Sequence, residues 1–249
     1  MDGEHVSIRS PIRLLAIGDC NTEGCRQLPE QSSLPALVAK LLTQRGRSVD
    51  VRNWGRTMST TREGLSRVLD EPAAADVALI NFGLVDAWVT TIPQIYIPYY
   101  PDSFVRKWGR KLLKMAKRRL RRPWLSRIVP LGAVVSLEEY RTNVDRMIVA
   151  VRSVNPAAIV VLWGTVPVLH DEERNQKLAD YNHSLRELAA ARHAVYVDAA
   201  EIVALLPTSE AYLDAVHLNE PALALIARAI VECLGLPDLE RRKPSRMVA

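Results

Sequence analysis

A buried strand that turns into a helix is encoded near the N-terminus by Leu14-Leu15-Ala16-Ile17-Gly18-Asp19-Cys20-Asn21-Thr22-Glu23-Gly24. The first four residues are apolar, and the polar residues after Gly18 are typical of a turn and of the start of a helix. At such a turn, backbone N–H groups and the helix dipole stabilise negative charge. We therefore expect a lowered thiol pKa at Cys20 and a nearby site for an oxyanion.

Apolar runs alternate with helical patterns along most of the chain. The patterns predict strands at 12–17, 48–52, 77–82, 159–163 and 194–197, and helices at 34–45, 60–69, 137–154, 172–192 and 220–234. Continuous apolar strands that alternate with helices are typical of a parallel sheet covered on both faces. We expect one α/β domain over residues 1–249, with functional residues on loops at the carboxyl ends of the strands.

A second pattern, Asp214-Ala215-Val216-His217, lies far downstream, just before the last predicted helix. An aspartate at this spacing can hold the Nδ1–H of the histidine, so that Nε2 is left to act on a nucleophile. A cysteine after a strand is more often a packing residue than a reactive one. The chain order and the Asp-x-x-His partner favour a Cys-His-Asp triad of Cys20, His217 and Asp214.

These two motifs together resemble the first and last blocks of the SGNH/GDSL hydrolases, in which a Gly-Asp-Ser turn is paired with Asp-x-x-His. Residues 53–60 resemble the second block of that family, residues 81–86 its Gly-x-Asn-Asp block, and residues 217–219 its His-Pro-Asn ending. The resemblance covers nearly the whole chain. It implies a flavodoxin-like, three-layer α/β/α fold with a five-stranded parallel sheet, and acyl hydrolysis or acyl transfer.

The resemblance also implies the role of each residue of the site. Cys20 stands at the position of the serine nucleophile, with His217 as general base and then acid, and Asp214 orients the histidine. The glycine of the second block falls on Met58, or on Gly55 if the register is shifted.

The oxyanion asparagine of the family falls on Val85, and loss of one such donor typically costs about 2.7–4 kcal/mol of transition-state stabilisation. The backbone N–H groups of Cys20 and Met58 remain as oxyanion donors. Asn53 and Gly55 belong to the same oxyanion and substrate region.

Three interpretations of the function stay open. In the first, the chain is an esterase, thioesterase or acyltransferase that works through an acyl-Cys intermediate. In the second, it is a catalytically silent binding or accessory protein. In the third, it is a serine enzyme whose nucleophile has been replaced by cysteine. A looser resemblance to accessory proteins of surface-polysaccharide assembly favours an acylated carbohydrate or lipid-linked substrate.

The net charge of +5 conceals an uneven distribution. Between Asp102 and Glu138 there are 11 basic residues and no acidic one, which leaves 22 basic against 28 acidic residues in the rest of the chain. We expect residues 88–135 to be a basic insertion after the third strand, with an amphipathic helix over 103–122. A cluster of arginines lies near the end of that helix: Arg118, Arg119, Arg121 and Arg122.

The basic helix has three possible roles. In the first, it is a lid docked by an apolar stripe that includes Phe104 and Trp108. In the second, it lies on an anionic membrane surface. In the third, its cations bind an anionic glycan or lipid-linked substrate. Nucleic acid is the least favoured partner, because no nucleic-acid-binding fold is recognised.

The composition and motifs of the sequence limit the cellular compartment and the cofactors that we expect. The sequence lacks an apolar run of transmembrane length and a secretory leader, and it has only three cysteines, so we expect a cytoplasmic protein, with contact at the inner membrane face. His170, His183 and His193 lack the spacing of metal ligands, and no glycine-rich phosphate loop is present. We expect no metal and no cofactor.

Overall fold

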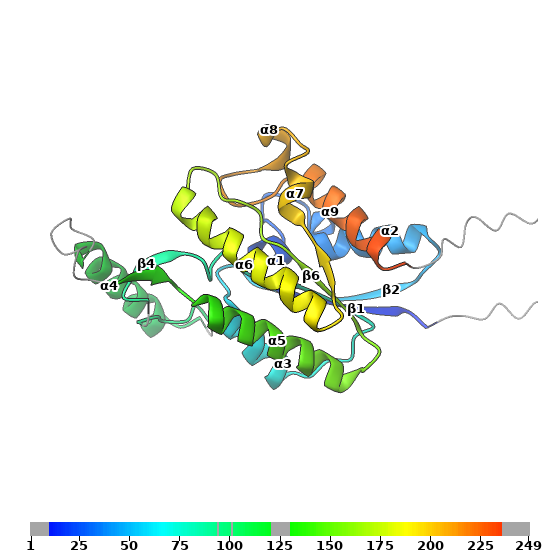
Figure 1. Cartoon of the computed structure of the whole chain (residues 1–249), viewed down its shortest axis with the longest axis horizontal. Helices are drawn as coiled ribbons and strands as arrows, with labels where there is room; N and C mark the ends of the chain where they lie inside the picture. The colour runs from blue at the N-terminus through cyan, green and yellow to red at the C-terminus, as the bar shows by residue number, and fades with distance from the viewer. Residues whose placement is uncertain (1–9, 94, 101, 121–129, 236–249) are drawn as a thin grey trace, which may run out of the picture.

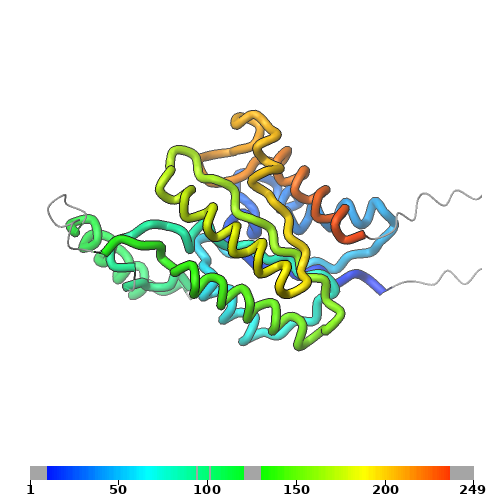
Figure 2. The backbone as a smooth tube through the Cα atoms, in the orientation of Figure 1, coloured from blue at the N-terminus to red at the C-terminus, as the bar shows by residue number. Residues whose placement is uncertain are grey.

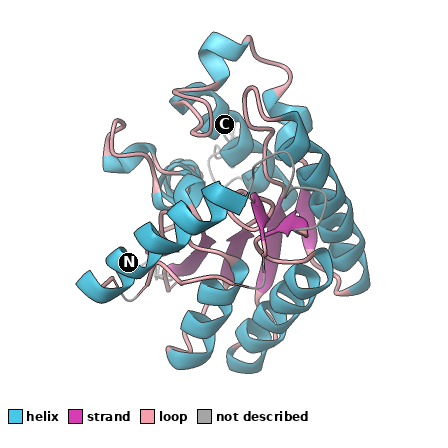
Figure 3. Cartoon of the chain, turned by 90° about the vertical axis from the view of Figure 1, so that its left-hand side faces the viewer, coloured by secondary structure: helices cyan, strands magenta, loops and turns pink. Residues whose placement is uncertain are grey.

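A five-stranded parallel sheet forms the centre of the computed structural model, which describes residues 10–93, 95–100, 102–120 and 130–235 (Figure 3). The strand order is β2-β1-β3-β6-β7. The chain order reverses between β1 and β3, and in such sheets this is where ligands bind, beyond the carboxyl ends of the strands. The strands are β1 (Ile12–Gly18), β2 (Val49–Gly55), β3 (Val77–Asn81), β6 (Ile159–Trp163) and β7 (Val195–Val197).

Helices cover both faces of the sheet, which confirms the predicted three-layer α/β/α class (Figure 1). Successive residues of a strand point to opposite faces. Leu15 and Ile17 therefore pack in one core, under α3 (Thr61–Asp70), α5 (Leu137–Val154) and α6 (Glu172–Ala191). Leu14 and Ala16 pack in the other, under α2 (Leu34–Gln44), α7 (Ala199–Val203) and α9 (Glu220–Cys233).

Most elements begin and end within two residues of the predicted bounds. The main exception is β2, which continues to Gly55 because its pairing with β1 runs on until Gly18 meets Gly55. The short helix α1 (Cys20–Glu23) begins where the start of a helix was predicted after Gly18. The other short helices were not predicted, since periodicity cannot detect a single turn: a 3-10 turn (Glu30–Ser32), α7 (Ala199–Val203) and α8 (Thr208–Ala211).

The segment between β3 and α5 forms an arm on the left of Figures 1 and 2. In it, β4 (Val89–Thr91) pairs antiparallel with β5 (Leu131–Ala133), and α4 (Phe104–Leu120) lies between them in sequence. Helix α4 buries none of its side chains, and Phe104 and Trp108 are 75% and 55% exposed. The interpretation of α4 as a lid docked by this apolar stripe is therefore wrong.

Arg118 and Arg119 lie in the last turn of α4. Arg121 and Arg122 of the predicted arginine cluster lie outside the described residues. Among the helices described, none has both the length and the apolar character needed to cross a bilayer.

Candidate active site

Cys20 lies two residues after the end of β1, at the first position of α1. Asp19 caps this helix, since its Oδ1 accepts the N–H of Asn21 at 3.0 Å. Only glycine fits at position 18, because a Cβ there would lie 2.1 Å from Thr22 Oγ1 and 2.5 Å from the carbonyl oxygen of Asn81. The turn therefore presses the start of α1 against the end of β3, and Cys20 is only 6% exposed.

The Cys20 thiol is protonated at neutral pH, contrary to the expectation of a lowered pKa. Burial raises the pKa of Cys20 well above its usual range, and the charge of Asp19 raises it further. The backbone N–H groups of Cys20 and Asn21 oppose this shift but do not outweigh it. Because α1 has only four residues, its dipole is small. Attack by Cys20 would require a base to remove the proton.

A histidine held by an aspartate lies in the loop before α9. His217 Nδ1 lies 2.7 Å from Asp214 Oδ2, and Asp214 Oδ1 accepts the N–H groups of Val216 and His217, both at 2.8 Å. Burial works to raise the pKa of Asp214, but these hydrogen bonds outweigh it and lower the pKa. The carboxylate therefore fixes the imidazole by Nδ1 and leaves Nε2 free for chemistry.

Asn21, which the sequence analysis missed, joins the two motifs. Its Oδ1 accepts the N–H of Leu218 at 3.4 Å, and its Nδ2 donates to the Val216 carbonyl at 3.5 Å. Asn21 is only 6% exposed, so its amide bridges the nucleophile turn and the histidine loop inside the molecule. Within the described residues, no hydrogen bond joins Cys20 Sγ to His217.

The two candidates for the second-block glycine differ in environment. A Cβ at Gly55 would lie 2.2 Å from the backbone nitrogen of Glu23, so Gly55 allows β2 to contact α1 closely. Met58 has φ 64°, a left-handed backbone that favours glycine. Asn53 stabilises the contact between β2 and α1, because its Nδ2 donates to the Thr22 carbonyl at 3.0 Å and its Oδ1 accepts the Gly55 N–H at 2.8 Å.

Val85 follows β3 and is buried, and its side chain offers no hydrogen-bond donor. The next residue, Asp86, anchors this loop by accepting the N–H and the hydroxyl of Thr61 at 2.9 and 2.7 Å. Burial raises the pKa of Asp86 to about 6. Any oxyanion donor near Val85 must therefore be a backbone N–H or another side chain.

A buried arginine lies behind this loop. The Nη2 of Arg174 donates to the Leu84 carbonyl, its guanidinium carbon lies 5.3 Å from the centre of the Trp88 ring, and its Nε has no partner among the described residues. Sequence reasoning missed Arg174, although it is in phase with Leu178 and Tyr181 on the buried face of α6. A charged residue within the apolar stripe of a predicted helix indicates a buried charge, and this signal was present in the sequence.

A cavity of about 630 Å³ opens beside these loops, between α4 and β4. Met58, Val85 and Trp88 are among the residues that line it. The described part of the chain holds no cluster of three or more His, Cys, Asp or Glu side chains placed to bind a metal.

Comparisons with known proteins identify a family and a shared fold. Residues 16–224 match the GDSL-like lipase/acylhydrolase family. A catalytic mutant of an acetylxylan esterase from Geobacillus stearothermophilus is similar in structure (TM-score 0.61, 20% identity, 92% of this chain and 97% of that one). A lipase/acylhydrolase from Enterococcus faecalis is also similar (TM-score 0.60, 19% identity, 90% and 95%). At this identity the structures show the fold alone. Comparison of the sequence with curated proteins gives no significant match.

Proposed function

The chain belongs to the GDSL-like lipase/acylhydrolase family, and from that premise we propose that it cleaves or transfers acyl groups through an acyl-Cys20 intermediate. The observation that carries the proposal is the His217–Asp214 pair, held at 2.7 Å and tied by Asn21 to the turn that bears Cys20. Family membership supports acyl hydrolysis or transfer in general. The cysteine nucleophile is our own addition to it.

In the proposed reaction, Cys20 Sγ attacks the acyl carbonyl while His217 Nε2 takes the thiol proton. The backbone N–H groups of Cys20 and Met58 donate to the oxyanion that forms. The tetrahedral intermediate then expels an alcohol or thiol, which receives the proton from His217, and acyl-Cys20 remains. Water or an acceptor hydroxyl, deprotonated by His217, releases the acyl group.

For the substrate we propose an acylated carbohydrate or lipid-linked molecule, as in surface-polysaccharide assembly. A carbohydrate esterase is among the structurally similar proteins, which supports this choice. The three cysteines are free, which suits a reducing cytoplasm. The exposed apolar stripe and the cations of α4, within the predicted 103–122 helix, suit contact with the inner membrane face.

A second candidate, a catalytically silent binding or accessory protein, is favoured by two specific observations. The Cys20 thiol is buried with a raised pKa, and Val85 provides no side-chain donor for an oxyanion. A protein of this kind would bind an acylated ligand at the same loops without turnover.

Intact-mass measurement separates the two candidates. We expect p-nitrophenyl acetate or an acyl thioester to add one acyl group to the wild-type protein and none to Cys20→Ala. His217→Ala should slow acylation by at least about a hundredfold. Cys25→Ala is the matched control, since this second cysteine lies close to α1 in sequence and should leave acylation unchanged. Absence of both adduct and turnover in the wild type would support the silent candidate instead.

A further inference from the structure

The cavity beside Met58 and Val85 has a basic wall. Helix α4 contributes Arg110, Lys111, Lys114, Lys117 and Arg118 to this wall, and no acidic side chain lines the cavity within the described residues. The lining residues from outside α4 are mainly apolar and aromatic and include Val89, Ile95, Ile97 and Tyr99. One side of the cavity thus suits an anion, and the other suits a hydrocarbon chain.

Two of these cations have no partner among the described residues, whereas Lys111 Nζ lies 6.0 Å from the centre of the Trp108 ring. Arg110 is engaged, because it bonds to Asp102 and to the Pro98 carbonyl, and Lys117 Nζ donates to Thr90 Oγ1 at 3.3 Å. In the described part of the chain, Lys114 and Arg118 have no hydrogen bond or ion pair. They are four residues apart on one helix face and therefore lie on the same side of α4. Like charges at this spacing repel each other unless an anion lies between them.

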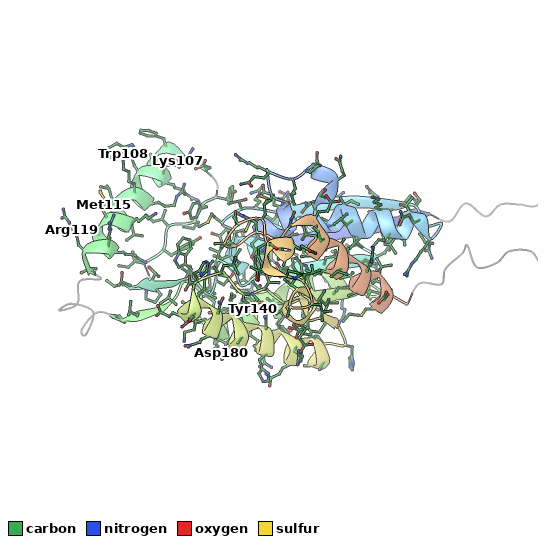
Figure 4. The ribbon with its side chains drawn as sticks, turned by 90° about the horizontal axis from the view of Figure 1, so that it is seen from above. Lys107, Trp108, Met115, Arg119, Tyr140 and Asp180 are labelled. Carbon is green, nitrogen blue, oxygen red and sulfur yellow. The ribbon has the colours of Figure 1, made fainter. Side chains whose placement is uncertain are left out.

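Helix α4 is amphipathic in an unusual orientation. Its cavity side bears the cations, whereas Trp108, Leu112 and Met115 are about half exposed or more. Figure 4 shows Trp108, Met115 and Arg119 on the side of α4 turned away from the rest of the chain. A helix that only covered a core would turn its apolar stripe inward, so a ligand is the simplest reason for an inward basic side.

We propose that this cavity binds the phosphate group of an amphiphilic substrate, with Lys114 and Arg118 as the phosphate ligands and the apolar lining as the site of the attached chain. Lys117 adds a third cation, since its Nζ lies at the same wall. Met58 and Val85 line the cavity and follow β2 and β3, the strands on either side of β1, so we expect the attached chain to extend toward Cys20. This assignment rests on the proposed acyl chemistry for its biological meaning but not for its test.

The test measures binding in the Cys20→Ala protein, so that a failure of catalysis cannot be mistaken for a failure of the site. The probes are dodecyl phosphate and the neutral dodecyl maltoside, titrated by calorimetry. We expect the phosphate to bind at least tenfold more tightly than the maltoside. The Lys114→Ala/Arg118→Ala pair should weaken phosphate binding by at least tenfold and leave maltoside binding within about twofold.

The matched control is Lys107→Ala/Arg119→Ala, which removes the same charge from positions of α4 that do not line the cavity; Asp102, the partner of Lys107, keeps its bond to Arg110. It should change phosphate binding less than threefold, since neither residue lines the cavity. An equal loss of phosphate affinity in the two double variants would overturn the proposal. Equal affinity of the unaltered cavity for dodecyl phosphate and dodecyl maltoside would overturn it as well. Circular dichroism of each variant verifies that α4 is intact, and Lys114→Glu gives a second, independent variant.

The phosphate could belong to an acyl-thioester donor or to a lipid-linked glycan. Competition distinguishes these sources, because coenzyme A displaces dodecyl phosphate in the first case and a polyprenyl phosphate displaces it in the second. Displacement by either one supports the site and names its source. Displacement by neither contradicts it.

Discussion

Asp19 has a fully buried carboxyl group next to Cys20, and its protonation state changes near neutral pH. Burial raises its pKa from 3.8 to about 7, with the charge of Asp86 adding to the shift and Arg174 opposing it. In the unfolded chain this carboxyl ionises near pH 4. The stability gained by keeping it neutral in the fold is therefore complete below about pH 4 and is lost as the pH rises to about 7.

We predict that Asp19→Asn is more stable than the wild type at pH 8, and that this advantage shrinks toward zero at pH 4. Asparagine keeps the oxygen that caps α1 but cannot ionise. A shift of about three pKa units sets an upper limit of about 4 kcal/mol on the difference in free energy of unfolding between the two pH values. Urea unfolding at both pH values measures it. Asp50→Asn, an exposed aspartate, is the control, and an advantage of the same size at both pH values would contradict the prediction.

Residue identity predicted the members of the site better than their chemistry. The motifs predicted a common site for Cys20 and Asp214-x-x-His217, and the structure links their two loops through Asn21. Met58 has the left-handed backbone that favours glycine. The thiol pKa was predicted in the wrong direction, because it depends on burial by residues distant in sequence. Asn21 was missed for the same reason, since only the fold places it in the interior, whereas the buried position of Arg174 could have been read from its phase with Leu178 on α6.

At the scale of elements, α4 shows what periodicity can and cannot predict. Its helical pattern gave bounds within about two residues of Phe104–Leu120. The same pattern could not say which side faces the protein, because an amphipathic helix has two candidate sides. The structure leaves the apolar side exposed and turns the basic side to the cavity.

We predict that Phe104→Ala/Trp108→Ala lowers partitioning onto vesicles that contain anionic lipid by at least about tenfold. Burial of one such side chain contributes roughly 1.5–3 kcal/mol. The melting temperature should not change, since both side chains are exposed in the free protein. Vesicle sedimentation measures the partitioning. Leu69→Ala/Leu205→Ala removes exposed apolar side chains from other elements and should leave partitioning unchanged, and an equal loss in this control would refute a specific α4 contact.

At the scale of the whole molecule, topology gathers the site from segments far apart in sequence. Parallel pairing places the ends of β1, β2 and β3 at one edge of the sheet, so that Cys20, Met58 and Val85 follow neighbouring strands. This much was predictable, since the alternation of strands and helices permits few topologies. The pairing of β4 with β5 in the arm was not, because it depends on contacts that no local pattern encodes.

The arm also makes the charge of the molecule asymmetric, which leads to a prediction about ionic strength. Eleven basic residues lie between Asp102 and Glu138, whereas the remaining chain has a net charge of −6. The arm extends to one side in Figure 1, so its electrostatic field acts on an approaching anionic surface ahead of the acidic body.

Salt should weaken this attraction, because the screening length falls from about 10 Å at 0.1 M to about 3 Å at 1 M. We expect binding to anionic vesicles to fall at least about tenfold over that range, while hydrolysis of a neutral acetyl ester by the same sample stays constant. Vesicle binding that does not respond to salt would mean that the charge of the arm does not guide association, and a parallel loss of ester hydrolysis would mean that salt acts on the fold instead.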